Sequence, residues 1–325
     1  MRLIITGSSG QIGTNLALRC LDRGHEVLGI DCRPNPWTDA FPYALADLRA
    51  PHSWARLWGT HGAWVRPDAV IHLAAHAKVH QLVETPQLAL ENIVMTHHVL
   101  EACRAQRAPI VFASSREVYG DVGHDRVHEI DARFDHAASS YAASKIAAET
   151  MLHAYACSYG LRYLVLRLSN VYGRYDNDVD RMERVVPLFI RAIDRGEPVT
   201  VFGADKVIDF TYIDDCVEGI VNGVERVAMG CLQDETVNLA YGQGHRLLEL
   251  VQHIGRTLGH SPLVRIADKR AGEISYYVAD IEKARRLLDF QPKVGLEEGI
   301  RRAVAWYFEW AQPRHESAAD SRGKA

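Results

Sequence analysis

The chain opens with an apolar segment, a glycine-rich turn and a helical pattern in immediate succession. Residues 2–6 read Arg-Leu-Ile-Ile-Thr, then come Gly7, Gly10 and Gly13, and apolar residues recur with helical spacing over 11–23. A strand ending in such a turn aims the first amides of a helix at an anion, and glycines let the backbone approach a pyrophosphate. The GxxGxxG spacing in this context indicates a dinucleotide-binding turn.

A carboxylate follows the second apolar run. Residues 26–30 read Glu-Val-Leu-Gly-Ile, and Asp31 stands at their end. A carboxylate at this place accepts hydrogen bonds from the adenosine ribose hydroxyls and repels a 2′-phosphate. Asp31 therefore favours NAD over NADP, although Arg33 could weaken that preference and Asp31 could also be a plain turn residue.

Strand-like and helical patterns alternate through the first half of the chain. This alternation predicts an α/β fold of the Rossmann type, a doubly wound parallel sheet with helices on both faces. Strands are expected at 2–6, 26–30, 69–73, 109–114 and 163–168, and helices at about 11–23, 87–106 and 141–159.

After about residue 170 the pattern changes to short strands and amphipathic helices. Strands are expected at 199–202 and 210–213, and helices at 187–195, 247–258 and 281–288. We expect residues 1–170 to form the NAD-binding domain, with 207–241 returning to it, and residues 171–206 and 242–312 to form a smaller α/β substrate-binding lobe. The polar tail, residues 313–325, is expected to be disordered.

Composition excludes several classes of function. The net charge is -4, so no excess of basic residues suggests a nucleic-acid partner, and no apolar run approaches the length of about 20 residues that spans a membrane. Six scattered cysteines without CxxC spacing fit reduced thiols in a cytoplasmic protein. The sixteen histidines are scattered too, and His97-His98 within a helical stretch indicates packing or solvation in preference to a metal site.

A possible acid/base pair lies in Tyr141-Ala-Ala-Ser-Lys145. Residues four apart share a helix face, so Tyr141 and Lys145 are expected to point the same way. An ammonium beside a phenol should lower the phenol's pKa from about 10 towards neutrality. With Ser115 to orient a substrate hydroxyl, such a phenolate is suited to proton transfer during hydride transfer at a secondary alcohol.

Taken together, these motifs resemble the extended short-chain dehydrogenases/reductases, and within them the NAD-dependent nucleotide-sugar epimerase/dehydratase family. The resemblance covers about residues 1–310. Besides the glycine turn and Tyr141-x-x-x-Lys145, it rests on Asp47-Leu48, His72-Leu-Ala-Ala-His-Ala-Lys78, Asn92, Ser114-Ser-Arg-Glu-Val-Tyr-Gly120, Arg167-Leu-Ser-Asn-Val-Tyr-Gly173 and Phe210-Thr-Tyr-Ile-Asp-Asp215.

The resemblance implies a role for each matching residue. Tyr141 would be the base, Lys145 would hold the nicotinamide ribose, Ser115 would bind the sugar O4, and Asn170 and Arg270 would contact the diphosphate. The implied NAD contacts are Gly7, Gly10, Gln11, Ile12, Gly13, Asp31, Asp47, Leu48, Ala74, Ala75, Lys78, Asn92, Tyr141 and Lys145. The implied substrate contacts are Lys78, Ser115, Arg116, Asn170, Val186, Phe202, Arg270 and Glu273.

The residues after Ser115 depart from several members of the family. Related dehydratases and decarboxylases place a glutamate at the position of Glu117, on the C5 side of the sugar, and dehydratases add an aspartate where this chain has Arg116. The missing aspartate disfavours a standard 4,6-dehydratase. Glu117, as an additional catalytic acid or base, keeps elimination open, and a structural hydrogen bond is the other interpretation.

A second departure concerns the substrate phosphate. The family commonly has an arginine at the position of Ile208, which cannot bind phosphate. Lys206, Arg174, Arg181 or Arg184 could supply the charge instead. The segment 173–184 is rich in both charge signs, and it could be a specificity loop over the sugar or merely a solvated loop.

These observations favour an NAD-dependent nucleotide-sugar 4-epimerase of UDP-hexose or UDP-hexuronate type, acting through a 4-keto sugar. Open alternatives are a dehydratase or decarboxylase that uses Glu117, a net dehydrogenase or reductase, and a binding protein on the same fold. Small and apolar residues on the helices 87–106 and 141–159 also suggest a homodimer through a four-helix bundle, as in the family. Packing against their own sheet alone would explain them equally well.

Overall fold

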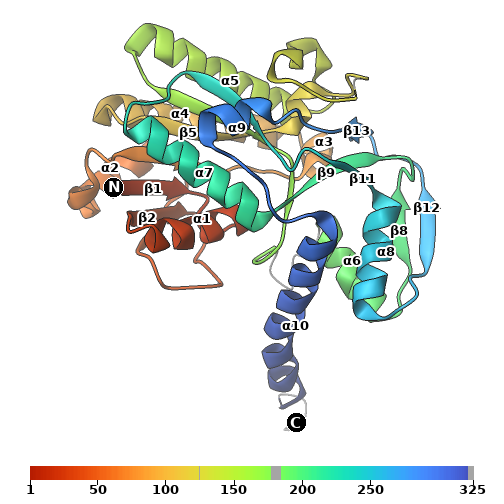
Figure 1. Cartoon of the computed structure of the whole chain (residues 1–325). Helices are drawn as coiled ribbons and strands as arrows, with labels where there is room; N and C mark the ends of the chain where they lie inside the picture. Colours follow the sequence, from red (N-terminus) through yellow and green to blue (C-terminus); the bar gives the residue numbers. More distant parts are fainter. Residues whose placement is uncertain (124, 177–183, 321–325) are drawn as a thin grey trace.

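A parallel sheet forms the centre of the structure. The computed structural model describes residues 1–123, 125–176 and 184–320, and within these ranges the large sheet has seven strands in the order β10-β6-β5-β4-β1-β2-β3, all parallel. The predicted α/β doubly wound fold is confirmed (Figure 1). The strands are β1 (Arg2–Thr6), β2 (Glu26–Asp31), β3 (Tyr43–Leu45), β4 (Ala69–His72), β5 (Ile110–Ser115), β6 (Tyr163–Leu168) and β10 (Glu235–Leu239).

Helices cover both faces of this sheet because alternate strand residues point to opposite sides. Leu3 and Ile5 of β1 lie in the core on one face, whereas Ile4 lies in the core on the other. The first face is covered by α1 (Gln11–Asp22), α7 (Ile213–Ala228) and α9 (Glu282–Leu288). The second is covered by α2 (Ser53–Thr60), α4 (Gln87–Gln106) and α5 (Ser140–Tyr159).

A smaller lobe lies at one end of the sheet (Figure 1). Its four-stranded sheet has the order β11-β9-β13, with β7 also paired to β9, and a second pair joins β12 to β8. The strands are β7 (Asn170–Tyr172), β8 (Val199–Phe202), β9 (Val207–Tyr212), β11 (Gly244–Arg246), β12 (Val264–Ala267) and β13 (Tyr276–Tyr277). Helices α6 (Val185–Asp194), α8 (Leu247–Leu258) and α10 (Leu296–Asp320) complete the lobe.

Short elements connect these layers. They are α3 (Val79–Glu84) and the 3-10 helices η1 (Gly62–Trp64), η2 (Arg116–Tyr119), η3 (Glu129–Asp131) and η4 (Phe134–His136).

Two boundaries differ from the sequence expectation. Residues 207–212 belong to the small sheet as β9, so the chain returns to the large sheet only with α7 and β10. The tail was expected to be disordered from residue 313, but α10 continues through Asp320, and residues 321–325 lie outside the described part. Alanine and glutamate after Pro313 allow a helix that has already started to propagate.

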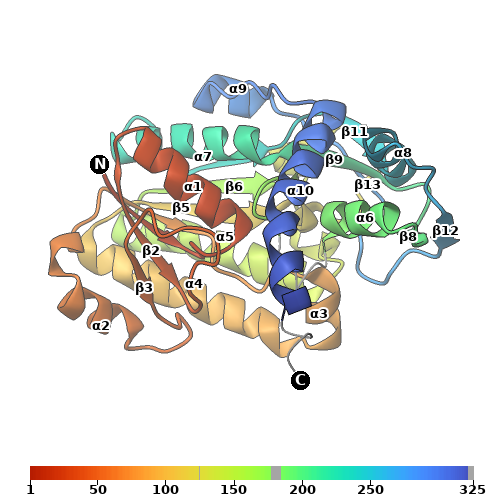
Figure 2. The ribbon, with the colours of Figure 1, turned by 90° about the horizontal axis from the view of Figure 1, so that it is seen from below.

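An aromatic cluster joins α10 to the large domain. Trp37, in the loop after β2, lies 5.6 Å from Trp306 and 4.9 Å from Trp310 between ring centroids, and Tyr175 lies 5.4 Å from Trp37. Trp306 and Trp310 stack on each other. Helix α10, which also packs against α8, is thereby held against the loops that follow β2 and β7 (Figure 2).

A buried polar network fixes α5 against the edge of the sheet. Arg167 of β6 donates to both carboxylate oxygens of Glu149 at 3.0 and 2.6 Å. The Glu149 carboxylate also accepts from Ser114, and Arg167 donates to the Tyr119 hydroxyl. Tyr119 in turn donates to Asn238 of β10. Strands β5, β6 and β10 and helix α5 are thus joined through groups with little exposure to water.

Removing one partner of the buried Glu149–Arg167 ion pair measures how strongly this network stabilises the fold. Glu149→Gln leaves the buried Arg167 without its counter-charge, so the free energy of unfolding should fall by about 3 kcal/mol in urea denaturation followed by circular dichroism. The matched control is Glu282→Gln, which removes a surface pair with Arg285 and should change stability very little. Equal losses in the two variants would contradict the account.

Candidate active site

The glycine turn between β1 and α1 is closely packed. Gly7 adopts a φ of +73°, and a Cβ there would lie 2.8 Å from the backbone nitrogen of Ala74. A Cβ on Gly13 would lie 2.1 Å from the carbonyl oxygen of Gly7. The N-cap of α1, Gly10, offers no side chain to its first turn. The amides of Gln11 and Ile12 therefore begin a helix whose positive end is left for an anion.

Asp31 lies at the carboxyl end of β2, beside this turn. Its carboxylate accepts hydrogen bonds from the backbone amides of Ser9 at 3.0 Å and Arg33 at 3.1 Å. The Arg33 side chain is exposed. The glycine turn leaves room for the pyrophosphate of NAD because its glycines carry no Cβ atoms. The buried Asp31 carboxylate fits the adenosine ribose.

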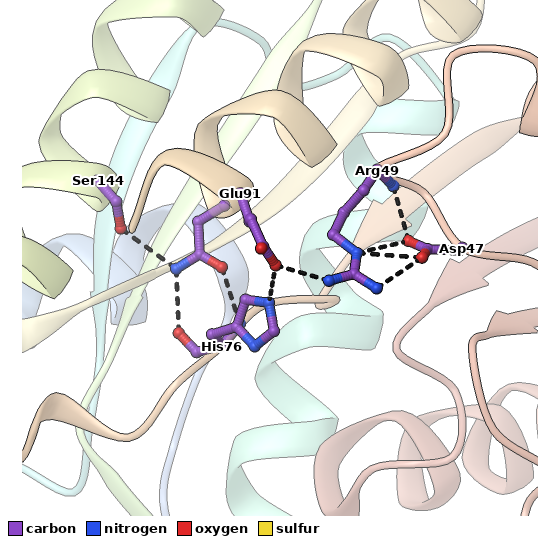
Figure 3. Close-up of polar contacts among 6 residues, drawn as sticks. Asp47, Arg49, His76, Glu91 and Ser144 are labelled. Carbon is purple, nitrogen blue, oxygen red and sulfur yellow. Dashed lines mark hydrogen bonds and ion pairs between the residues drawn. The ribbon is translucent and has the colours of Figure 1, made fainter. Parts of the chain in front are cut away.

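An ion-pair network extends from Asp47 (Figure 3). Arg49 donates to both oxygens of Asp47 and, at 2.8 Å, to Glu91, which also contacts His76 at 2.8 Å. Arg49 lowers the pKa of both carboxyl groups. Leu48 is buried in the core beneath. Arg49, His76 and Glu91 were not identified from the sequence, because no local pattern marks partners this far apart.

Asn92 orients the segment that follows β4. Its Oδ1 accepts from the amide of His76 at 2.8 Å, and its Nδ2 donates to the His76 carbonyl and to Ser144 on α5. Ala74, beside the glycine turn, and Ala75 and Lys78 lie in the segment that Asn92 holds. Asn92 therefore contributes to the expected cofactor path by holding the backbone at His76.

Tyr141 and Ser115 meet where β5 ends and α5 begins. Ser139 caps α5 by accepting from the amide of Ala142 at 3.1 Å, which fixes Tyr141 in the first turn. The Ser115 hydroxyl lies close enough to Tyr141 to lower the pKa of that phenol. Lys145, one turn further along α5, donates to the carbonyl of Ala113 at 2.8 Å.

The expected lowering of the Tyr141 pKa by Lys145 is wrong for this structure. Burial raises the pKa of Tyr141 to about 12, against the opposing effect of the Ser115 hydrogen bond. Burial also lowers the pKa of Lys145 to about 8, and its ammonium lies 5.9 Å from the centre of the Tyr141 ring. The depth of burial of Tyr141 decides the direction in which its pKa is shifted. The spacing of two residues in the sequence does not reveal this depth.

Arg116 and Glu117 form a buried ion pair directly after Ser115. Arg116 Nη2 lies 3.0 Å from Glu117 Oε1, and Arg116 Nε donates to Asn170 Oδ1 at 2.6 Å. The Glu117 amide donates to Ser115 Oγ at 3.2 Å. Burial raises the pKa of Glu117, with Arg116 opposing. The structure thus brings Arg116, Glu117, Asn170, Ser115 and Tyr141 together.

Other expected substrate residues lie in the lobe. The Arg270 guanidinium lies 4.0 Å from the centre of the Phe202 ring, and Lys206 forms an ion pair with Glu273. Val186 is buried in the apolar core of the lobe, so its side chain faces its neighbours.

Three of the four cations expected near Ile208 have partners elsewhere in the described part of the structure. Lys206 and Arg174 are paired with Glu273 and Asp214, and Arg184 donates to Gln11 and the Val171 carbonyl. Arg181 lies outside the described residues, as does most of the charged segment 173–184. Ile208 pairs in register with Tyr277, and the Arg116 guanidinium lies 5.7 Å from the centre of the Tyr277 ring. Arg116, which is itself paired with Glu117, thus contacts the residue that lies opposite Ile208.

Metal ligands and membrane-spanning helices are the next features of the described residues. Among the described residues, no group of three or more His, Cys, Asp or Glu side chains could hold a metal ion. In the same part of the chain, no helix is long and apolar enough to cross a membrane.

Comparisons with known proteins agree with this geometry. The model of the NAD dependent epimerase/dehydratase family matches residues 3–240. A probable UDP-glucuronate 4-epimerase of Rhizobium meliloti is 30% identical, over 94% of this chain and 97% of that protein. The crystal structure of a Thermus thermophilus UDP-glucose 4-epimerase with NAD is similar with a TM-score of 0.84 at 32% identity, covering 94% and 99% of the chains. A Thermotoga maritima UDP-glucose 4-epimerase structure with UDP-glucose has a TM-score of 0.86 at 27% identity, covering 95% and 99%.

The packing of the glycine turn predicts a sharp loss of cofactor on substitution. Gly13→Ala should weaken NAD binding by about tenfold or more, because its Cβ collides with the Gly7 carbonyl and forces the turn apart. Calorimetric titration of the variant with NAD measures this. Gly59→Ala on α2 is the control, since a Cβ there meets nothing within 4 Å. Unchanged NAD affinity in Gly13→Ala would contradict this placement of the cofactor.

Proposed function

Because the chain belongs to the NAD dependent epimerase/dehydratase family, we propose that it is an NAD-dependent 4-epimerase of a UDP-sugar. One observation carries the proposal: Tyr141 and Ser115 lie together, close enough for Ser115 to act on the pKa of the phenol, at the same edge of the sheet as the glycine turn and Asp31. Carboxyl ends of parallel strands are where doubly wound folds bind cofactor and substrate. The relatives that bind NAD or UDP-glucose support the same assignment.

The cofactor contacts follow from the turn outward. Gly7, Gly10 and Gly13 would admit the pyrophosphate, the amides of Gln11 and Ile12 would donate to it, and Asp31 would accept from the adenosine ribose. The remaining contacts are proposed for Asp47, Leu48, Ala74, Ala75, Lys78, Asn92 and Lys145. When bound, NAD accepts and returns the C4 hydrogen of the sugar as hydride, and its positive nicotinamide favours the phenolate of Tyr141.

Proton transfer is the task of Tyr141. The Tyr141 oxygen takes the proton of the sugar 4-hydroxyl while Ser115 holds the sugar O4. O4 then becomes the carbonyl oxygen of a 4-keto sugar. After the keto sugar has turned its other face to the cofactor, Tyr141 gives the proton back to O4. The product then differs from the substrate only in configuration at C4. Burial of Tyr141 excludes water from this exchange.

The small lobe would hold the nucleotide. We assign Asn170 and Arg270 to the diphosphate, because amide and guanidinium groups donate to phosphate oxygens, and Glu273 to the ribose. Phe202, already stacked with Arg270, would contact the base. On this view residues 1–170 and the returning α7 and β10 bind NAD, and the rest of the lobe selects the sugar nucleotide.

A homodimer is the assembly that the surface favours. Leu90 and Val94 are exposed on α4, and Tyr159 is exposed at the end of α5, which packs against α4. Burying this face against a second copy would form a bundle of four helices.

All six cysteines are free thiols, which supports a reducing, cytoplasmic setting.

Elimination is the second candidate function. Glu117 lies beside the reacting hydroxyl, and burial raises its pKa, so it could exchange a proton with a sugar carbon. Its ion pair with Arg116 opposes this role because a carboxylate stabilised by a guanidinium is a weaker base. We therefore assign Glu117 to substrate binding, and we rank elimination below epimerisation.

A single hydroxyl tests the proposed chemistry. Tyr141→Phe should lower kcat for interconversion of UDP-glucose and UDP-galactose by about 100-fold or more, because it removes the group that exchanges the proton. Its NAD content should match that of the wild type. Tyr155→Phe is the matched control, on the same helix but hydrogen-bonded to Glu101, and should keep full activity. Undiminished turnover in Tyr141→Phe would exclude this mechanism.

A further inference from the structure

Two neighbouring side chains of the site keep polar atoms without a partner although both are deeply buried. Arg116 is 8% exposed and Glu117 is 6% exposed. Arg116 Nη1 and Glu117 Oε2 make no hydrogen bond in the described part of the structure. Buried polar groups are nearly always satisfied, so an open donor and an open acceptor on two neighbouring buried side chains indicate the place of a ligand.

The pair is held rigidly by its other atoms. Arg116 Nε donates to Asn170, Nη2 contacts Glu117 Oε1, and the guanidinium lies over the Tyr277 ring. These contacts leave Nη1 as the free edge of Arg116. The backbone amide of Glu117 donates to Ser115, which fixes the base of its side chain. The open donor and acceptor are therefore set in position before a ligand arrives.

This open edge lies next to the reacting hydroxyl. Ser115, which accepts the hydrogen bond from the Glu117 amide, also lies close enough to Tyr141 to lower the pKa of the phenol. The charge of Glu117 reaches the Tyr141 hydroxyl and raises its pKa. A sugar whose 4-hydroxyl contacts Ser115 and Tyr141 thus has a neighbouring substituent in reach of the Arg116–Glu117 pair.

The charges around the pair cancel. Glu117 faces Arg116, Lys206, Glu273 and Asp121. Lys206 is paired with Glu273, and Asp121 with Lys269. A ligand carboxylate would bring another negative charge beside Glu117 with no uncommitted cation among these groups. A hydroxyl, by contrast, can accept from the Arg116 guanidinium or donate to the Glu117 carboxylate without adding a charge.

We propose that the Arg116–Glu117 pair is a specificity subsite that binds a hydroxyl of the sugar and selects neutral UDP-hexoses over UDP-hexuronates. This assignment rests on the proposed function and narrows its substrate class.

Binding measurements on the NAD-loaded protein test the subsite. Calorimetric titration of the wild type should give a dissociation constant for UDP-glucose about tenfold or more below that for UDP-glucuronate. Glu117→Gln keeps an acceptor for a hydroxyl but removes the negative charge. It should tighten UDP-glucuronate by about tenfold while affinity for UDP alone stays unchanged. Glu282→Gln, on the surface, is the control.

Each other outcome overturns the assignment. A wild type that binds UDP-glucuronate as tightly as UDP-glucose excludes selection for neutral sugars, and this comparison holds even if the variant fails to fold. A Glu117→Gln protein with reduced turnover but an unchanged ratio of the two affinities would make Glu117 an acid or base instead. Failure of the wild type to bind UDP or either UDP-sugar would remove the proposed function, and the subsite with it.

Discussion

The site depends on how α5 is fixed against the end of β5. Tyr141, Lys145 and Glu149 follow one another at four-residue spacing, so they share the helix face that meets this strand. Glu149 is held by Ser114 and Arg167 and Lys145 by the Ala113 carbonyl, while Tyr141 lies beside Ser115. Three successive residues of one strand thereby set the place of three successive turns of the helix. The buried ion pair at the far end orients the phenol at the near end.

On the substrate side of the site, position 208 carries no cation and position 116 carries an arginine. An isoleucine at position 208 leaves β9 without a cation, and the guanidinium of Arg116 comes from η2 to the neighbouring Tyr277. Arg116 brings its own counter-charge in Glu117, so the result is a neutral donor–acceptor pair. The site of this chain is consequently arranged for polar recognition of a sugar where an isolated arginine would recognise an anion.

Sequence patterns predicted the elements whose signal is local. The apolar strands, the glycine turn and the helices carrying Tyr141 and Asn92 were predicted because periodicity and spacing report them directly. Helix α7, β10 and the pairing of β9 with β11 and β13 were not assigned, because strand partners are set by contacts between distant segments. The pKa of Tyr141 was predicted in the wrong direction, since burial is a property of the fold. The Arg49–Glu91–His76 network was not predicted, because its members lie far apart in the sequence.

The central claim is that the C4 hydrogen leaves the sugar and returns to the same carbon within one site. UDP-glucose labelled with deuterium at C4 is incubated with the purified protein in ordinary water, and the products are followed by NMR. The account predicts UDP-galactose that keeps its deuterium at C4, with no solvent hydrogen exchanged at C5. Loss of the C4 label to solvent, exchange at C5, or a dehydrated product without a C4 epimer would contradict it.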